Sequence, residues 1–240
     1  MQKVEDRKST VLEPAGQFIT LEGLDGCGKS TQLEMLGDYL RSQGRAVILT
    51  REPGGTKVGQ KIREVLLNVS QEAITPLTEL SLMFAARSQH IEQVILPALQ
   101  RGELVVCDRF TDSSVAYQGY GRGVPLDTIR TLERLLCPGV RPDLTLLLDI
   151  DAATSIERTG VRNRKAHQPD TRFEQEGQLF FERVREGYLA IARQEPQRIR
   201  IIDGGGSIEQ LHVAVCAAVD EFLRISLPQD GRSPGETRGL

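Results

Sequence analysis

Eight consecutive residues, Gly23-Leu24-Asp25-Gly26-Cys27-Gly28-Lys29-Ser30, match the pattern G-x-x-x-x-G-K-[ST]. They lie between a strand-like apolar run at Phe18–Glu22 and a helical pattern that has Leu33, Leu36 and Leu40 on one face and ends near residue 44. Glycines let successive backbone N–H groups turn toward one anion, and the N-terminus of the following helix adds partial positive charge. We therefore expect a phosphate cradle, with a glycine-rich turn that binds nothing as the alternative.

The chemistry of the cradle assigns a role to several side chains. We expect Lys29 to reach the β- and γ-phosphates of a nucleotide, Ser30 to hold Mg²⁺, and Thr31 to contact the nucleotide with the rest of the loop. Asp108 ends the apolar run 104–107, which is the position of a second acid near the metal. An Asp at a strand end is also a common helix N-cap, so this alternative stays open.

Short apolar runs alternate with helical patterns along the chain. The predicted strands are 18–22, 46–50, 104–107, 144–150 and 199–202, and helical patterns follow at 58–67, 77–100, 125–137, 173–194 and 207–225. This alternation predicts the α/β class, with a five-stranded parallel sheet in a three-layer α/β/α arrangement and ligands at the carboxyl ends of the strands. We expect one domain over 17–226, with tails at 1–16 and 227–240.

Composition excludes several kinds of partner. The formal net charge is −3, from 30 Lys+Arg against 33 Asp+Glu, so no basic field favours nucleic acid or an anionic membrane. No apolar run approaches the roughly 18 residues of a membrane span, and the N-terminus is charged, so we expect a cytoplasmic protein. Four well-separated cysteines suggest neither disulfides nor a zinc site. Of the 30 cations 24 are arginine, which suits phosphate contacts but also follows from a GC-rich genome.

A phosphate cradle alone leaves a kinase, an ATPase motor and a GTPase switch open. The chain has no N-K-x-D segment that would read guanine, and its 240 residues leave little room for motor machinery. A small kinase needs a second phosphate site and a segment that closes over the reactants, because otherwise it would hydrolyse its nucleotide.

Three further segments supply such a site. They are T-R-E-P-G-G-T at 50–56, F-A-A-R-S-Q-H at 84–90, and D-R-F at 108–110 running on to S-S-V-A-Y-Q-G at 113–119. With the opening F-I-T-L-E-G-L-D-G-C-G-K-S-T, they closely resemble the thymidylate kinases, a family of nucleoside monophosphate kinases, over roughly residues 17–225. The resemblance implies a P-loop kinase fold with a small lid. It also implies transfer of a phosphoryl group from ATP to dTMP with Mg²⁺, and a homodimer.

The resemblance carries specific roles onto matching residues. Arg51 and Arg109 resemble the pair that grips the 5′-phosphate of the acceptor, and Asp25 resembles the carboxylate that binds its 3′-hydroxyl. Guanidinium forks suit phosphate oxygens and offset the repulsion between two phosphates. Lys29 and Arg109, with Asp108 at the metal, are expected to act in catalysis.

The same resemblance outlines a pocket for the base. Phe84 resembles the ring that stacks on thymine, and Arg87 resembles the donor to its O4. Ser114 takes the place of a small polar contact to the base edge, and Tyr117 that of the aromatic wall beside C2′. By themselves, Phe84 and Tyr117 would be read as core packing and a half-buried aromatic.

A basic segment matches the lid of the family, expected at about 157–172. Arg158, Arg162, Arg164 and Lys165 lie in it without an acid between them, which also fits a solvated helix end. Because the phosphate loop contains no arginine, the resemblance implies that the lid supplies the catalytic one. We expect Arg162 in that role, with Arg158 and Arg164 as supporting or alternative donors to ATP.

Two segments limit the resemblance. Related lids end in an Asp-Arg pair, whereas this chain has Asp170-Thr171-Arg172, so lid contacts around Thr171 are not carried over. Asp203 and Gly204 follow the last strand where the family rests adenine, although a flexible turn explains them equally well. A kinase for another nucleoside monophosphate, or a catalytically silent nucleotide-binding module, are the remaining alternatives.

Overall fold

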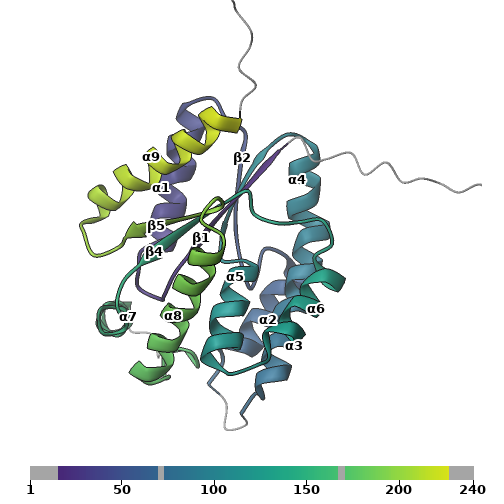
Figure 1. Ribbon diagram of the computed structural model, residues 1–240, viewed down its shortest axis with the longest axis vertical. Coiled ribbons are helices and arrows are strands. Elements are labelled where there is room, and N and C mark those ends of the chain that lie inside the picture. The colour runs from purple at the N-terminus through teal and green to yellow at the C-terminus, as the bar shows by residue number, and fades with distance from the viewer. Residues whose placement is uncertain (1–15, 70–72, 167–170, 227–240) are drawn as a thin grey trace, which may run out of the picture.

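The computed structural model describes residues 16–69, 73–166 and 171–226 (Figure 1). The expected tails at 1–16 and 227–240 therefore lie outside the described residues, apart from Gly16, whose amide donates to the carbonyl of Leu99 at 2.8 Å. Part of the expected lid, 167–170, also lies outside them.

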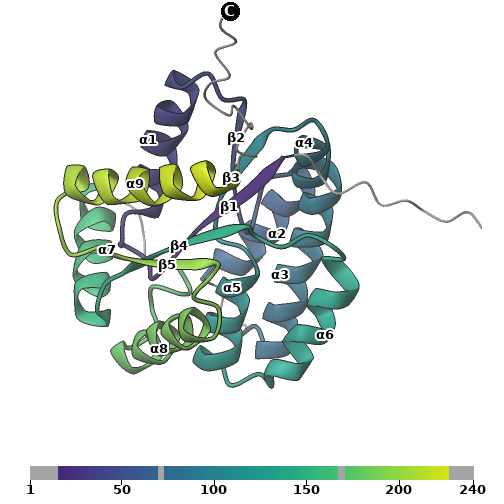
Figure 2. The same cartoon turned by 45° about the horizontal axis from the view of Figure 1, so that its top comes forward.

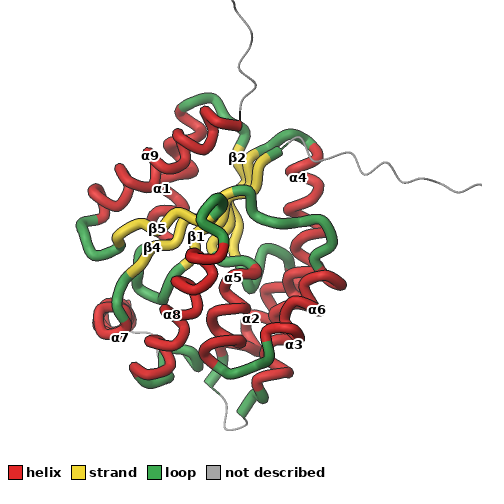
Figure 3. Tube along the Cα trace, viewed as in Figure 1, coloured by secondary structure: helices red, strands yellow, loops and turns green. Residues whose placement is uncertain are grey.

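A parallel sheet of five strands forms the centre of the protein, as the sequence predicts (Figure 3). The strands run in the order β2-β3-β1-β4-β5 and all four pairings are parallel. Their bounds are β1 Gln17–Glu22, β2 Val47–Arg51, β3 Leu104–Asp108, β4 Leu144–Asp149 and β5 Ile199–Asp203, each within two residues of the predicted run.

Helices cover both faces of the sheet (Figure 2). On one face lie α1 (Lys29–Ser42) and α9 (Ile208–Ser226), which pack against each other. On the other face lie α3 (Pro76–His90), α4 (Leu96–Gln100), α5 (Thr111–Ser114), α6 (Leu126–Leu136) and α8 (Gln178–Gln194), with α2 (Lys57–Leu67) packed beside α3. The described residues contain no helix long and apolar enough to cross a membrane.

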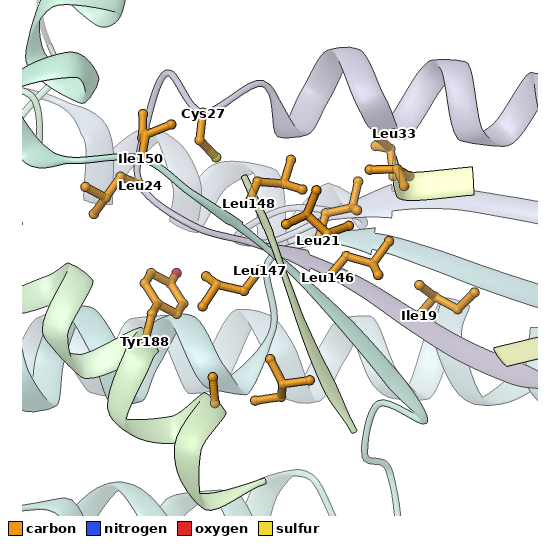
Figure 4. Close-up of a cluster of buried hydrophobic side chains, with 14 of the residues drawn as sticks. Ile19, Leu21, Leu24, Cys27, Leu33, Leu146, Leu147, Leu148, Ile150 and Tyr188 are labelled. Carbon is orange, nitrogen blue, oxygen red and sulfur yellow. The ribbon is translucent and has the colours of Figure 1, made fainter. Parts of the chain in front are cut away.

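The core fills the space on both sides of the strands. Ile19 and Val106 belong to a buried cluster that includes α1 and α9, whereas their neighbours Phe18 and Val105 belong to a second cluster that includes α3. Figure 4 shows the same alternation around β4, where Leu147 lies on the side of α8. Since successive side chains of a strand point to opposite faces, the apolar runs are those of a sheet buried on both faces.

The long helical pattern at 77–100 is broken by a wide turn. α3 is followed by a π-helical segment, η1 (Ile91–Ile95), and then by α4. Pro97 lies in the first turn of α4, where it has no N–H for the ladder and its ring would crowd the carbonyl four residues before it. The wide turn just before the proline accommodates both effects.

Two helical segments were not predicted from the periodicity. α5 and the π-helical η2 (Val115–Gly121) are rich in Ser, Thr and Gly, which are weak helix formers. Their stability comes from packing against α8: a Cβ on Gly121 would lie 2.7 Å from the ring of Phe180. The basic segment is the second half of a full helix, α7 (Ala152–Ala166), whose first turn is capped by Asp151 accepting from the amide of Thr154 at 2.8 Å.

Strand register brings three distant parts of the chain to one edge. Asp108 lies opposite both Leu21 on β1 and Arg51 on β2. The phosphate loop, which follows β1, therefore begins beside the ends of β2 and β3, and this edge carries the site described next.

Candidate active site

A cavity of about 420 Å³ lies at the carboxyl edge of the sheet. Its walls come from the phosphate loop, the ends of β2 and β3, helices α2, α3 and α7, segment η2 and the turn after the lid. The predicted residues that line it are Asp25, Gly26, Gly28, Lys29, Ser30, Thr31, Arg51, Arg87, Asp108, Arg109, Ser114, Tyr117, Arg158 and Arg162. Five other predicted site residues lie within the described ranges but do not line the cavity: Gly23, Leu24, Cys27, Phe84 and Arg164. Asp203 and Gly204 do not line it either.

The phosphate loop is packed tightly against α7. Gly26 has φ +77°, and a Cβ there would lie 3.1 Å from the carbonyl oxygen of Ser155 and from Cβ of Arg158. The hydroxyl of Ser155 donates to the carbonyl of Asp25 at 2.6 Å. Any side chain at position 26 would be strained and would push the loop away from the lid helix.

Lys29 is held beneath its own loop. Its ammonium donates to the carbonyls of Gly23 at 3.1 Å and Leu24 at 2.8 Å. These two residues therefore contact Lys29 through their backbone, and the side chain of Leu24 is buried in the core. The thiol of Cys27 is also buried beneath the loop, and burial raises its pKa.

Ser30 and Asp108 provide oxygen atoms suited to a magnesium ion. The hydroxyl of Ser30 donates to Oδ2 of Asp108 at 3.0 Å, while the buried Oδ1 of Asp108 has no hydrogen-bond partner in the part of the chain that the structure describes. Among the described residues, no group of three or more His, Cys, Asp or Glu could hold a metal. An ion here would take its other ligands from phosphate and water, as Mg²⁺ commonly does.

The backbone of Arg109 is in a conformation that is rare for a side-chain-bearing residue. Its φ is +72°, in the left-handed region, while its amide donates to the carbonyl of Leu21 at 3.0 Å. Such strain persists only where the surrounding structure holds it, and it is common at functional sites.

The side chain of Arg109 connects four parts of the site. Its guanidinium donates to Asp25 at 2.7 Å, to the hydroxyls of Tyr117 at 3.1 Å and Tyr188 at 3.0 Å, and to the carbonyl of Gly23 at 3.0 Å. Burial alone would raise the pKa of Asp25, but the charges of Arg109 and Lys29 outweigh it and lower that pKa to about 2. Asp25 is therefore an ionised acceptor at neutral pH.

A buried guanidinium fork forms another wall. Arg87 is 2% exposed and donates to Glu52 at 2.6 Å, to the hydroxyl of Ser114 at 3.1 Å and to the carbonyl of Phe110 at 3.0 Å. Glu52 also contacts Nδ1 of His90 at 2.9 Å. Glu52 lies inside a motif we used for the resemblance, yet its role as the carboxylate that fixes Arg87 was not predicted, since its partners lie far away in sequence.

Phe84, expected to stack on thymine, does not itself line the cavity. Its side chain is fully buried in the core cluster of α3, and the guanidinium of Arg87 lies 4.7 Å from its ring centroid. Arg87 lines the cavity, so the Phe84 ring lies next to a cavity wall, and its stacking on thymine stays a prediction. Met83, one turn before Arg87 on α3, lines the cavity and was not predicted.

A further cation was missed. Arg63 on α2 lines the cavity with Arg51 and donates to the carbonyl of Pro53 at 3.0 Å. Its pKa is lowered, first by burial and then by the positive charge of Arg51. One arginine in an amphipathic helix looks like a solvent-facing residue, so no sequence signal distinguished it.

The lid arginines have three different environments. Arg158 donates to the carbonyl of Gly204 at 2.8 Å and reaches that of Gly205 at 3.3 Å, which ties the lid helix to the loop after β5. Arg162 pairs with Glu174, a buried carboxylate of the turn after the lid. Arg164 is exposed to solvent.

Thr171, which departs from the family pattern, closes that turn. The amide of Thr171 donates to Oε2 of Glu174 at 2.6 Å, and the amide of Glu174 reaches the hydroxyl of Thr171 at 3.4 Å. This reciprocal pair is a capping box, in which threonine serves as the capping residue. Glu174 thus holds the lid cation Arg162 from a fixed turn.

Glu22 is a buried acid beneath the site. It accepts from the amide of Phe110 at 2.7 Å and from the hydroxyls of Ser113 at 2.6 Å and Tyr188 at 2.8 Å. Burial and the nearby charge of Asp112 raise its pKa from 4.5 to about 7, against the opposing charge of Arg109. Its protonation state is therefore linked to folding.

The fold and the site together define a class of protein. A parallel α/β sheet with a phosphate loop, an adjacent Ser–Asp pair and several cations lining one cavity is the arrangement of a P-loop phosphotransferase.

Comparison with known proteins identifies the family. The family model described as thymidylate kinase matches residues 21–215. The thymidylate kinase of Pelotomaculum thermopropionicum is 48% identical over 218 residues, which cover 91% of this chain and 99% of the relative. That of Alkalilimnicola ehrlichii is 51% identical over 208 residues, covering 87% and 92%. The crystal structure of thymidylate kinase from Ehrlichia chaffeensis superposes with a TM-score of 0.67 at 33% identity, covering 86% of this chain and 99% of that one. The chain belongs to the thymidylate kinase family.

Substitution of Glu22 tests the linkage between its titration and stability. Because the pKa is raised from 4.5 to about 7 in the folded state, the native protein holds a proton that the unfolded chain releases. The resulting stability is complete below about pH 4.5 and is lost as the pH rises through about 7. Measured by chemical denaturation, the free energy of unfolding should fall over this range relative to that of Glu22→Gln. A difference between the two proteins that does not change with pH would contradict the assignment.

Proposed function

We propose that the cavity transfers the γ-phosphoryl group of ATP to the 5′-phosphate of dTMP, giving ADP and dTDP. The observation that carries this proposal is that one cavity joins a phosphate loop to a buried guanidinium fork, that of Arg87, which suits a carbonyl oxygen of a base. Membership of the thymidylate kinase family supports the same reaction.

The donor phosphates would bind at the loop. Lys29 and the loop amides at the N-terminus of α1 would hold the β- and γ-phosphates. Ser30 and Asp108 would hold Mg²⁺, with Asp108 ordering the water around it, and the unpartnered Oδ1 of Asp108 supports this role. When bound, the ion neutralises charge that develops on the phosphate oxygens.

The acceptor would bind against the cations and the buried fork. Arg51 and Arg109, joined by Arg63, would bind its 5′-phosphate, since forked donors match phosphate oxygens. The ionised Asp25 would accept a hydrogen bond from its 3′-hydroxyl. An acceptor phosphate that is already charged needs no strong base, so we propose no covalent intermediate and assign catalysis to positioning and charge stabilisation.

The base would bind beside Arg87. Its guanidinium would donate to O4 of thymine, Ser114 would contact the base edge, and Tyr117 would form the wall beside C2′. Phe84, whose ring lies against Arg87, would stack on thymine, and Met83, which lines the cavity, would add an apolar contact to the base. The thioether of Met83 is polarisable and makes favourable contacts with aromatic rings.

A panel of acceptors tests the substrate. ADP release measured with dTMP, dUMP, dCMP and AMP should be more efficient with dTMP and dUMP than with dCMP or AMP, because the fork of Arg87 fits an oxygen at position 4 and not an amino group. AMP or dCMP as the best acceptor would assign the chain to another nucleoside monophosphate kinase. No turnover with any acceptor would indicate a silent nucleotide-binding module.

Arg162 is proposed to stabilise the transferring phosphoryl group. It lies in the lid helix and lines the cavity, and the phosphate loop contains no arginine. Arg158 is engaged by the loop after β5, and Arg164 is exposed, so both are assigned supporting roles toward ATP.

Arg162→Ala should lower kcat by a factor of about 10³ or more while ATP still binds, as expected for a contact made in the transition state. Lys165→Ala, on the same helix, is the control, since Lys165 is exposed and does not line the cavity. Steady-state kinetics and nucleotide binding would be measured on both. An unchanged kcat in Arg162→Ala would move the role to Arg158 or Arg164.

We also propose a homodimer that forms through α2, α3 and α6. These helices lie side by side in Figures 1 and 2, and Val65, Leu77 and Leu135 on them are each more than half exposed. Leu135→Asp should therefore shift the mass measured by light scattering from dimer toward monomer, whereas Leu179→Asp on α8, equally exposed, should not. A monomeric unsubstituted protein would refute the proposal.

The cytoplasm is the compartment we propose. All four cysteines are free, and Cys27, Cys107 and Cys137 are buried. Free thiols fit a reducing environment.

A further inference from the structure

A fully buried carboxylate, that of Glu79, contacts residues from two walls of the cavity. These two walls come from segments that lie far apart in the sequence. Glu79, in the first turn of α3, is 0% exposed. Its Oε1 accepts from the amide nitrogen of Gln118 at 2.7 Å, and its Oε2 lies 2.7 Å from a guanidinium nitrogen of Arg172. Arg122 approaches the same carboxylate at 3.3 Å.

The first of these partners faces the ligand space. Gln118, on η2, is 1% exposed and lines the cavity together with Arg87 and Ser114. A carboxylate only accepts hydrogen bonds, so Glu79 fixes which end of the Gln118 amide points toward it. The orientation of this wall residue therefore depends on Glu79.

The second partner, Arg172, holds the C-terminal end of the lid segment against α2. Arg172 also donates through Nε to the carbonyl of Leu66 at 3.0 Å, and its amide donates to that of Leu67 at 3.2 Å. It lies in the turn that Thr171 and Glu174 close, and Glu174 holds Arg162. The contacts thus run from Gln118 through Glu79 and Arg172 to the turn that carries the partner of the lid arginine.

The ion pair is essential to this arrangement for an electrostatic reason. The buried guanidinium nitrogen of Arg172 nearest Glu79 has no hydrogen-bond partner among the described residues, so the charge of Glu79 is what compensates it. Removing one member of a buried pair leaves the other charged and desolvated, which is strongly unfavourable. Without Glu79, Arg172 would move toward water and take the turn with it.

We propose that Glu79 is a positioning residue for phosphoryl transfer, which holds the base wall through Gln118 and the lid arginine through Arg172. This inference rests on the proposed roles of the cavity and of Arg162. It assigns to Glu79 no contact with a substrate. Glu79 affects kcat by positioning Arg172 and the turn that holds Arg162. It affects the KM for dTMP by orienting Gln118.

Two variants separate these effects. Arg172→Gln should lower kcat by about tenfold to a hundredfold, because small misplacements of a catalytic group have effects of that size, while the KM for dTMP stays within twofold. Glu79→Gln should lower kcat and also raise the KM for dTMP. Arg172→Lys, which keeps the charge opposite Glu79, should recover most of the lost kcat, and equal losses in Arg172→Lys and Arg172→Gln would overturn the proposal.

A double-mutant cycle tests the route. If Arg172 acts through Arg162, Arg172→Gln should have little further effect on kcat in an Arg162→Ala background. An equal loss in both backgrounds would overturn the positioning role while leaving the proposed function intact. If Arg162→Ala alone has normal kcat, the assignment of Arg162 fails, and this proposal fails with it.

Arg198→Gln controls for general destabilisation. Arg198 is a matched buried guanidinium, 9% exposed, that pairs with Asp112 at 2.7 Å and does not line the cavity. It should lower the Tm in thermal unfolding while leaving kcat within twofold. A loss of kcat equal to that of Arg172→Gln at a similar Tm would overturn the proposal. If Glu79→Gln does not fold, the Arg172 variants decide the question alone.

Discussion

The guanidinium of Arg109 is the contact on which the rest of the site depends. It is the first residue after β3, and it reaches back to the loop after β1 through Gly23 and Asp25 and forward to η2 and α8 through Tyr117 and Tyr188. The strained φ of +72° is the local cost of that geometry, and the register of three parallel strands maintains it.

The same principle recurs around the cavity, where buried or partly buried carboxylates fix arginines. Asp25 pairs with Arg109, Glu52 with Arg87, Glu174 with Arg162 and Glu79 with Arg172. Pairing stiffens long side chains that would otherwise lose entropy on binding. The site therefore combines near-balanced charge with several arginines that line one cavity, in a chain whose net charge is −3.

Much of the fold and part of the site could be predicted from the sequence. Strands are found within two residues of their predicted bounds because each is a short apolar run, and the phosphate loop is a local pattern whose chemistry requires only neighbours. The site could not be predicted where the side chains that contact each other lie far apart in the sequence. Glu52 and Arg87 are 35 positions apart, and nothing local relates them. Helical spacing placed Phe84 and Arg87 on one face, and the guanidinium of Arg87 does lie over the ring of Phe84, but the spacing did not indicate that Met83 lines the cavity. The glycine-containing segment η2 escaped prediction because its packing, and not its propensity, makes it helical.

The pairing of Arg162 with Glu174 has a consequence for how a nucleotide would bind. In the proposed reaction, a phosphate reaching Arg162 does not meet an unoccupied cation; it replaces a carboxylate that is already in place. Binding then becomes an exchange of one anion for another, and the arginine is compensated before, during and after the exchange. The side chain of Arg162 is 56% exposed, so it can change partners in contact with water, and Glu174, still held by the amide of Thr171, remains in position to receive Arg162 when the product leaves.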